Sequence, residues 1–276
     1  MVNKKLNLFS NILNFNMITI KFSDNIIHGY NNFETILQLD DYNDIVYINC
    51  NNNNKISNLP ELPNSLEKLW CNNNNLFILP KLPNSLESLC CNNNNLFSLP
   101  ELPNSLKILI CNNNNNLAIL PELPNSLLEL ICNNDNLSIL PDLPNSLKRL
   151  YCNNNNLSSL PVLPNLLTHL CCDRNKLSSL PKLPNLLRKL WCSHNNLSSL
   201  PELPNSLSSC YYECNPIYEY IKQYFDGETK NYIEHNKNMR RIFANKISNW
   251  FLECKYNPKY LYCRQKLMKE YDELYN

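Results

Sequence analysis

One stretch of sequence decides the fold: Leu59-Pro60-Glu61-Leu62-Pro63-Asn64-Ser65-Leu66-Glu67-Lys68-Leu69-Trp70-Cys71-Asn72-Asn73-Asn74-Asn75-Leu76. Close copies of it begin at Leu79, Leu99, Leu120, Leu140, Leu160, Leu180 and Leu200. The step is 20 residues, except for one step of 21 where an additional Asn enters between Asn112 and Asn116. The last of these copies, which begins at Leu200, is decayed, and a looser copy precedes the array, so the chain contains nine strand-like segments. Such a fixed period is typical of a solenoid built from one short structural unit.

Within each copy, the apolar residues alternate with polar or mixed ones. Leu69 and Cys71 alternate with Lys68, Trp70 and Asn72, which predicts a short strand with one apolar face. A lone strand of this length cannot bury that face, whereas stacking the copies in parallel builds one continuous core. Sixteen of the 18 prolines are the paired Pro of Leu-Pro-x-Leu-Pro. Because proline fixes φ and lacks an N–H, these pairs predict an extended, polyproline-like convex side.

The spacing Leu-x-x-Leu-x-Cys-x-x-Asn-x-Leu resembles that of the leucine-rich-repeat family, with Cys in the third apolar position. The first copy carries it on Leu66, Leu69, Cys71, Asn74 and Leu76. The short Leu-Pro-x-Leu-Pro form is similar to the repeats of bacterial secreted effectors, and the Asn-rich, Gly-poor composition looks like that of giant DNA virus repeat proteins. The resemblance implies an α/β-solenoid, the leucine-rich-repeat horseshoe, with a parallel β-sheet on its concave side. It also implies a surface that binds protein.

The chain divides into three predicted parts: an N-terminal cap (1–44), a solenoid of about nine repeats (45–217) and a helical basic C-terminal extension (218–276). Within the cap, residues 17–22 alternate like a strand, and residues 33–39 suit a short helix or strand. Polar Asn residues interrupt any signal-peptide core near the start, and no apolar run is long enough to span a membrane. We therefore expect an intracellular protein, in the host cytoplasm if the chain is viral.

The composition excludes several classes of enzyme. With 2 Gly, the chain contains no GxGxxG fingerprint, no P-loop and no GxSxG elbow. The net charge of +1 argues against a bulk polyanion binder. His169, Cys171 and Asp173 alternate on one strand and suggest zinc or a Cys–His pair, but same-face residues lie about 7 Å apart on an open sheet. We expect no catalytic residue, no metal and no cofactor.

Cysteine and asparagine recur at fixed repeat positions, which predicts structural roles for both. Eight cysteines point inward and replace leucine in the core, where a free thiol packs like a small apolar group. In-register parallel strands do not aim these thiols at one another, so we expect them to be reduced. Asn74 and its equivalents can form an amide ladder at the turn, and the flanking Asn residues tolerate positive φ. Asp135 is the one departure from that ladder, so we expect a local weak point there.

The concave face carries the candidate partner-binding residues. Between each Leu69-like and Cys71-like position, one residue points outward, and eight of nine such residues are apolar or aromatic. A solvated sheet face would be mostly polar, and Trp and Tyr are common interface hot spots. The alternative is cross-strand stacking that stabilises the sheet alone. The candidates are Trp70, Ile110, Ile131, Tyr151, Trp191 and Tyr211, with the charged neighbouring row Arg149, His169 and Lys189.

The C-terminal extension carries a second candidate surface. Between Lys230 and Lys269, ten basic residues face two acidic ones, a net charge of +8 interleaved with aromatic residues. The main basic residues are Arg240, Arg241, Lys246, Lys259, Arg264 and Lys266. A basic amphipathic helix can dock nucleic acid, an acidic protein or a membrane surface, while the alternative is the solvated face of a capping helix. A role as substrate adaptor for a ubiquitin ligase also stays open.

Overall fold

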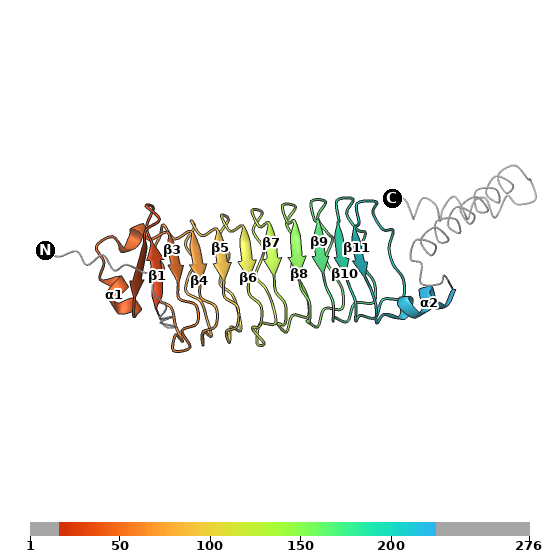
Figure 1. The fold of residues 1–276 in the computed structure, drawn as a ribbon, viewed down its shortest axis with the longest axis horizontal. Helices are drawn as coiled ribbons and strands as arrows, with labels where there is room; N and C mark the ends of the chain where they lie inside the picture. The colour runs from red at the N-terminus through yellow and green to blue at the C-terminus, as the bar shows by residue number, and fades with distance from the viewer. Residues whose placement is uncertain (1–16, 225–276) are drawn as a thin grey trace, which may run out of the picture. The chain divides into compact units, whose positions relative to one another are not determined.

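The computed structural model describes residues 17–224. The chain forms two compact units, residues 1–217 and residues 218–276. The first unit is built around an 11-stranded sheet with the order β11-β10-β9-β8-β7-β6-β5-β4-β3-β1-β2 (Figure 1). From β3 onward, neighbours in the sheet are neighbours in the chain, so the structure is a solenoid in which each turn contacts the next.

Nine short parallel strands, one from each repeat, form the main part of this sheet. Equivalent residues pair in register throughout, as Leu69 does with Leu89. The prediction of nine strand segments is therefore confirmed in residues 17–224. The strands are β3 (Tyr47–Asn49), β4 (Lys68–Trp70), β5 (Ser88–Cys90), β6 (Ile108–Ile110), β7 (Glu129–Ile131), β8 (Arg149–Tyr151), β9 (His169–Cys171), β10 (Lys189–Trp191) and β11 (Ser209–Tyr211).

An antiparallel hairpin and two short helices precede the repeats. They are β1 (Ile18–Lys21), β2 (Ile27–Tyr30), α1 (Phe33–Leu37) and the 3-10 helix η1 (Tyr42–Asp44). β1 lies between β2 and β3 and pairs antiparallel with both, and its Ile20 is fully buried opposite Ile48. The strand expected within residues 17–22 is present, and of the helix or strand expected within residues 33–39 the structure has the helix. The pairing of β1 covers the edge that β3 would otherwise expose.

The core is a stack of identical layers. Leu66, Leu69, Cys71 and Leu76 of one repeat are all fully buried, and so are their equivalents in the following repeats up to that of β10. In the last repeat, Leu207 and Cys210 are partly exposed. Each buried leucine contributes about 1.5–3 kcal/mol relative to exposure, so the layers stabilise one another only when stacked. The inward orientation predicted for the eight cysteines is confirmed, because all eight have no exposed surface.

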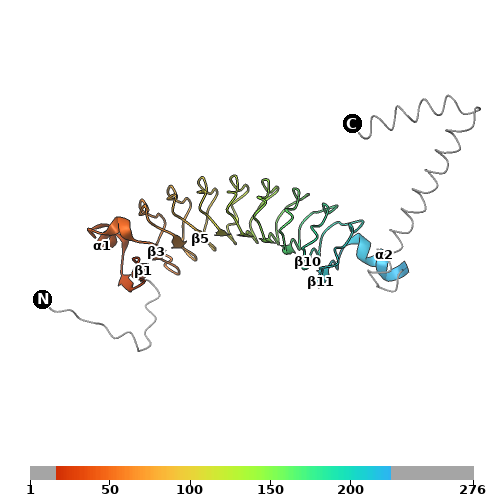
Figure 2. The same ribbon diagram turned by 90° about the horizontal axis from the view of Figure 1, so that it is seen from above.

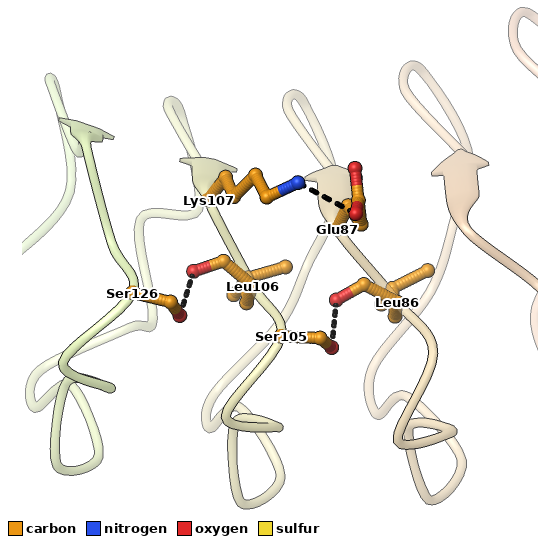
Figure 3. A network of polar contacts seen from close by, with 6 residues as sticks. All are labelled: Leu86, Glu87, Ser105, Leu106, Lys107 and Ser126. Atoms are coloured by element: carbon orange, nitrogen blue, oxygen red, sulfur yellow. Dashed lines mark hydrogen bonds and ion pairs between the residues drawn. The ribbon is translucent and has the colours of Figure 1, made fainter.

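The segments that return from one strand to the next contain neither helix nor strand. The second proline of each pair starts a turn, in which the Leu66 N–H donates to the Pro63 carbonyl at 3.1 Å. The serine before that leucine then links repeats. Ser105 Oγ donates to the Leu86 carbonyl at 2.6 Å and Ser126 Oγ to the Leu106 carbonyl at 2.7 Å (Figure 3). In the same view, Lys107 pairs with Glu87 at 2.6 Å across the repeat boundary.

The buried asparagine ladder forms as predicted. Asn155 Nδ2 donates to the carbonyls of Cys132, Cys152 and Asn153 at 2.8, 3.2 and 3.3 Å, while its Oδ1 accepts from Leu137 N–H at 3.1 Å. One side chain therefore satisfies four backbone groups that the turn leaves without partners. This is the reason why the position requires a side chain that both donates and accepts.

The residue before each ladder position has positive φ, which is how the chain turns without glycine. Six of these nine residues are Asn, as expected, and the last three are Arg174, His194 and Cys214, with φ of 54°, 55° and 57°. A left-handed φ costs such side chains more than it costs Asn. The Asn residues gain a further bond, because Asn93 Nδ2 donates to Asn73 Oδ1 at 2.6 Å.

The array of residues 17–217 curves gently, with the strands along its inner side (Figure 2). The concave sheet is therefore the broad surface that the repeats present together. A helix, α2 (Pro216–Tyr224), follows the last strand, and the Ile217 N–H donates to the Leu197 carbonyl at 2.9 Å. No helix within residues 17–224 is long and apolar enough to cross a membrane.

Candidate functional site

Three rows of side chains cover the concave face. The entry row is the first residue of each strand, the middle row is the third residue, and the exit row is the residue two positions after the middle one. Strand register places consecutive members of a row beside one another. The middle row is Asn49, Trp70, Cys90, Ile110, Ile131, Tyr151, Cys171, Trp191 and Tyr211.

The two ends of the middle row expose aromatic rings. Trp70 is 37% exposed and lies edge-to-face with Tyr47, with ring centroids 5.4 Å apart. Tyr211 is 50% exposed and lies edge-to-face with Trp191 at 5.8 Å. Trp191 Nε1 donates to Ser209 Oγ at 3.3 Å, which orients the indole. The rings are held by neighbours and still present apolar surface, which is the arrangement of an interface anchor.

The centre of the middle row is less exposed. Ile110, Ile131 and Tyr151 are half-buried, and Cys171 is 1% exposed although it points to the concave side. Its register neighbours, Tyr151 and Trp191, are large enough to cover a thiol between them. Part of this row therefore packs on itself across the strands, as the alternative interpretation requires.

Cationic groups gather in the entry row of the C-terminal repeats. Arg149 donates to Glu129 at 2.6 Å, and His169 pairs in register with Arg149 on one side and Lys189 on the other. Burial lowers the pKa of His169 below its usual value, and the charges of Lys189 and Arg149 lower it further. These effects favour the neutral imidazole.

The exit row is mostly uncharged and bound to the backbone. Asn72 Oδ1 accepts the Asn92 N–H at 2.7 Å, and the same bond recurs along the row. In the last repeats, Asp173 Oδ1 accepts the Ser193 N–H at 2.7 Å, and Ser193 Oγ donates to Glu213 Oε2 at 2.7 Å. The N-terminal half of this row is therefore neutral, and the C-terminal half is anionic.

The same C-terminal end of the face is hollowed. A pocket of about 540 Å³ is lined by residues of both the middle and exit rows and by the turn beside them. Its lining residues are Asp173, Arg174, Trp191, Ser193, His194, Tyr211 and Glu213. The sequence pattern indicated the charged residues Arg149, His169 and Lys189 in this half of the face, and it did not indicate a pocket.

The thiol and metal alternatives find little support in residues 17–224. All twelve cysteines of this part are free, and burial raises the pKa of the core thiols, for example that of Cys50 to about 12. Such thiols stay protonated and unreactive at neutral pH. No group of three His, Cys, Asp or Glu side chains in the described part converges as a metal site would require.

Two apolar features of the outer surface were missed by the sequence analysis. Leu166 and Leu186 stand where other repeats have the linking serine, and they are 45% and 50% exposed beside Val162. A second feature is a flank of exposed side chains in the N-terminal repeats. It consists of Phe77, Ile78, Phe97, Ile119 and Ile139. The sequence contained a signal for this flank, because Ser-Ser occupies the equivalent positions after β8, β9 and β10.

Solved structures of other proteins share this architecture. YopM from Yersinia enterocolitica WA-314 matches at 33% identity over 62% of this chain and 42% of that chain, with a TM-score of 0.51. The chain has the leucine-rich-repeat fold. YopM from Yersinia pestis, a leucine-rich effector, matches at 34% identity over 62% of this chain and 61% of that one, with a TM-score of 0.41. The leucine-rich-repeat domain of a Shigella effector matches at 29% identity over 67% and 76%, with a TM-score of 0.47.

The leucine-rich-repeat chain thus spans 42% and 61% of the two YopM chains that it resembles. No family model matches the chain, and no curated protein matches it. The basic residues predicted as a second surface lie outside the described residues. They are Arg240, Arg241, Lys246, Lys259, Arg264 and Lys266.

Proposed function

We propose that residues 45–217 form a non-enzymatic protein-interaction module that binds a partner protein on its concave face. The observation that carries this proposal is the C-terminal end of the middle row, where Trp191 and Tyr211 expose aromatic surface. Bacterial effectors with the same fold give the proposal a structural precedent. The buried free thiols support an intracellular setting for this module.

The rows that flank these aromatic residues favour an oriented partner. Cationic Arg149 and Lys189 lie in the entry row, while Asp173 and Glu213 lie in the exit row. Because Arg149 is paired with Glu129, Lys189 supplies the positive charge on one side of the aromatic row, and the carboxylates supply negative charge on the other. Such charge complementarity determines register and association rate more than affinity, whereas the desolvated aromatic anchors supply most of the binding energy.

Partner capture from a native lysate by immobilised full-length protein tests the proposal. We expect Trp191→Ala, alone and with Tyr151→Ala, to lower capture at least tenfold, because an aromatic hot spot contributes about 2 kcal/mol or more. The matched control is Phe97→Ser, which removes an exposed ring (56% exposed) from the outer flank. Serine is the native residue at the equivalent positions 158, 178 and 198. Equal capture by the wild type and the Trp191 and Tyr151 variants would sink the proposal.

A second function rests on sequence alone. The charge of +8 between Lys230 and Lys269 favours a tether to nucleic acid or an anionic membrane surface. Adaptor activity for a ubiquitin ligase is compatible with either surface, and no residue of the chain distinguishes it from the other two functions. The tether differs from the interaction module in its salt dependence, which is the basis of a prediction below.

A further inference from the structure

The pocket at the C-terminal end of the concave face combines two kinds of lining. Trp191 and Tyr211 supply aromatic surface, and Asp173 and Glu213 supply carboxylates. Its volume, about 540 Å³, is within the range of roughly 300–1,000 Å³ that is typical of ligand pockets. Aromatic faces and carboxylates attract the same class of group, which is an organic cation.

The carboxylates are fixed in place by one residue between them. Ser193 donates its N–H to Asp173 Oδ1 and its hydroxyl to Glu213 Oε2, both at 2.7 Å. One oxygen of each carboxylate is thus occupied, and the second oxygen retains its capacity to accept a hydrogen bond. Burial raises the pKa of Asp173, and the nearby Glu213 charge raises it too. A cation bound between the two carboxylates would relieve this repulsion.

The charge of the lining also selects for a cation. As formal charges, with histidine not counted, Asp173 and Glu213 contribute two negative charges and Arg174 contributes one positive charge, so the sum is −1. The equivalent exit-row positions of earlier repeats hold uncharged Asn, as at Asn133. The anionic character therefore belongs to this pocket and not to the repeat as such.

We propose that this pocket binds a lysine or arginine side chain presented by the partner protein. The cationic head lies against the Trp191 and Tyr211 rings and donates hydrogen bonds to the second carboxylate oxygens of Asp173 and Glu213. This inference rests on the proposed function, since it names the chemistry of the group that the concave face recognises.

The chain offers isosteric variants for the test. Asp173→Asn removes the charge and keeps an oxygen for the Ser193 N–H, because Asn fills this position in most other repeats. Glu213→Gln keeps an oxygen for the Ser193 hydroxyl. Glu87→Gln is the matched control, because it removes one carboxylate from a distant repeat of the same sheet.

Fluorescence of a single tryptophan measures binding in the full-length protein. Trp70→Phe with Trp250→Phe leaves Trp191 as the last of the 3 tryptophans. The probes are Nα-acetyl-lysine amide and its Nε-acetylated, uncharged form. We expect the charged probe to change Trp191 emission saturably, with a dissociation constant on the order of 1–10 mM, and the neutral probe to bind at least fivefold more weakly. Asp173→Asn and Glu213→Gln should each weaken the charged probe about fivefold, and Glu87→Gln should not.

Two outcomes overturn the inference: equal responses to the charged and neutral probes, or no response to the charged probe at roughly 50 mM. The partner-capture assay separates this failure from that of the proposed function. If Trp191→Ala abolishes capture while Asp173→Asn and Glu213→Gln retain it, the concave face binds a partner without a cation in the pocket. If Trp191→Ala, alone and with Tyr151→Ala, also retains capture, the proposed function itself is wrong.

Discussion

Replacing Asp135 with asparagine should stabilise the protein, and the gain should depend on pH. Asp135 occupies the buried ladder position that is Asn in every other repeat, and it is 8% exposed. Its Oδ1 accepts the Asn114 N–H at 2.7 Å, but its Oδ2 is buried without a partner. By repeat equivalence with Asn155, Oδ2 takes the place of an amide nitrogen that donates to backbone carbonyls. An ionised carboxylate oxygen at this place faces the backbone carbonyl oxygens but has no hydrogen to donate to them.

The pKa of Asp135 gives the magnitude and the sign. Burial raises it from 3.8 to about 7, and the Asn114 N–H opposes part of this effect. Because the folded pKa is raised, the unfolded chain releases its proton near pH 4 while the folded chain keeps it. Stability is therefore lost as pH rises from about 4 to 7 and is constant above that range. At about 1.4 kcal/mol per pKa unit, the loss is at most about 4 kcal/mol.

Urea unfolding followed by circular dichroism measures this effect. At pH 8 we expect Asp135→Asn to raise the free energy of unfolding by about 2–4 kcal/mol, because the amide donates where the carboxylate cannot. At pH 4 the protonated acid can donate one hydrogen, so the difference should fall below about 1 kcal/mol. The control is Asp142→Asn, which removes the same charge from an exposed site in the next segment.

Two results would refute this reasoning. One is a stability difference between Asp135→Asn and the wild type that is the same at pH 4 and pH 8. The other is a carbon-13 NMR titration in which the Asp135 carboxyl group has an ordinary pKa near 4. Either result would mean that water or a rearranged turn solvates the carboxylate.

Three further changes test other parts of the chain. Asn155→Ala should lower the free energy of unfolding by about 2–4 kcal/mol in urea, because three backbone carbonyls lose their donor; an unchanged midpoint would show that the ladder is dispensable. Cys214→Asn should raise the melting temperature and increase the free energy of unfolding by about 0.5–1 kcal/mol, because φ at this position is 57° and Asn tolerates it better than Cys. Cys214→Val should lower it, and the same sign for both variants would contradict the explanation. If the extension is a tether, replacing Arg240, Arg241 and Lys246 with Gln should make the slope of log affinity against log salt concentration shallower by up to about three, for DNA or anionic vesicles. An identical slope would remove the tether from consideration.

The repeat fold could be predicted because every repeat solves the same packing problem. Leu69, Cys71 and Asn74 recur at fixed spacing, and each position has one environment in a parallel stack. Periodicity therefore predicted the strand register, the inward thiols and the amide ladder, and the structure confirms all three. Asp135 Oδ2 is buried without a partner, which supports the expected weak point in the ladder.

What could not be predicted depends on differences between neighbouring repeats. In the 21-residue repeat, the Leu117 N–H turns back to the Asn114 carbonyl, so the ladder acceptor of the next repeat loses its usual donor. The step from Ile48 to Leu69 is also 21 residues, the Ile56 N–H likewise returns to Asn53, and Asn74 Oδ1 is left without a partner. The burial of Cys171 depends in the same way on its larger neighbours. Such effects can be recognised only in the three-dimensional stack, because the interacting residues lie about one repeat apart in the sequence.

The residues that differ from the repeat pattern indicate positions where a requirement other than stability determines the side chain. Arg174 and His194 adopt left-handed φ where earlier repeats place the more tolerant Asn, and Asp173 puts a half-buried carboxylate where Asn would bind the same N–H. Each choice destabilises the solenoid relative to the residue that the chain uses elsewhere. All three residues line the pocket that Trp191 and Tyr211 complete. Local rules that are broken together at one place, without a compensating gain in packing, are characteristic of a functional site, and for this reason we expect the partner to contact the C-terminal end of the concave face.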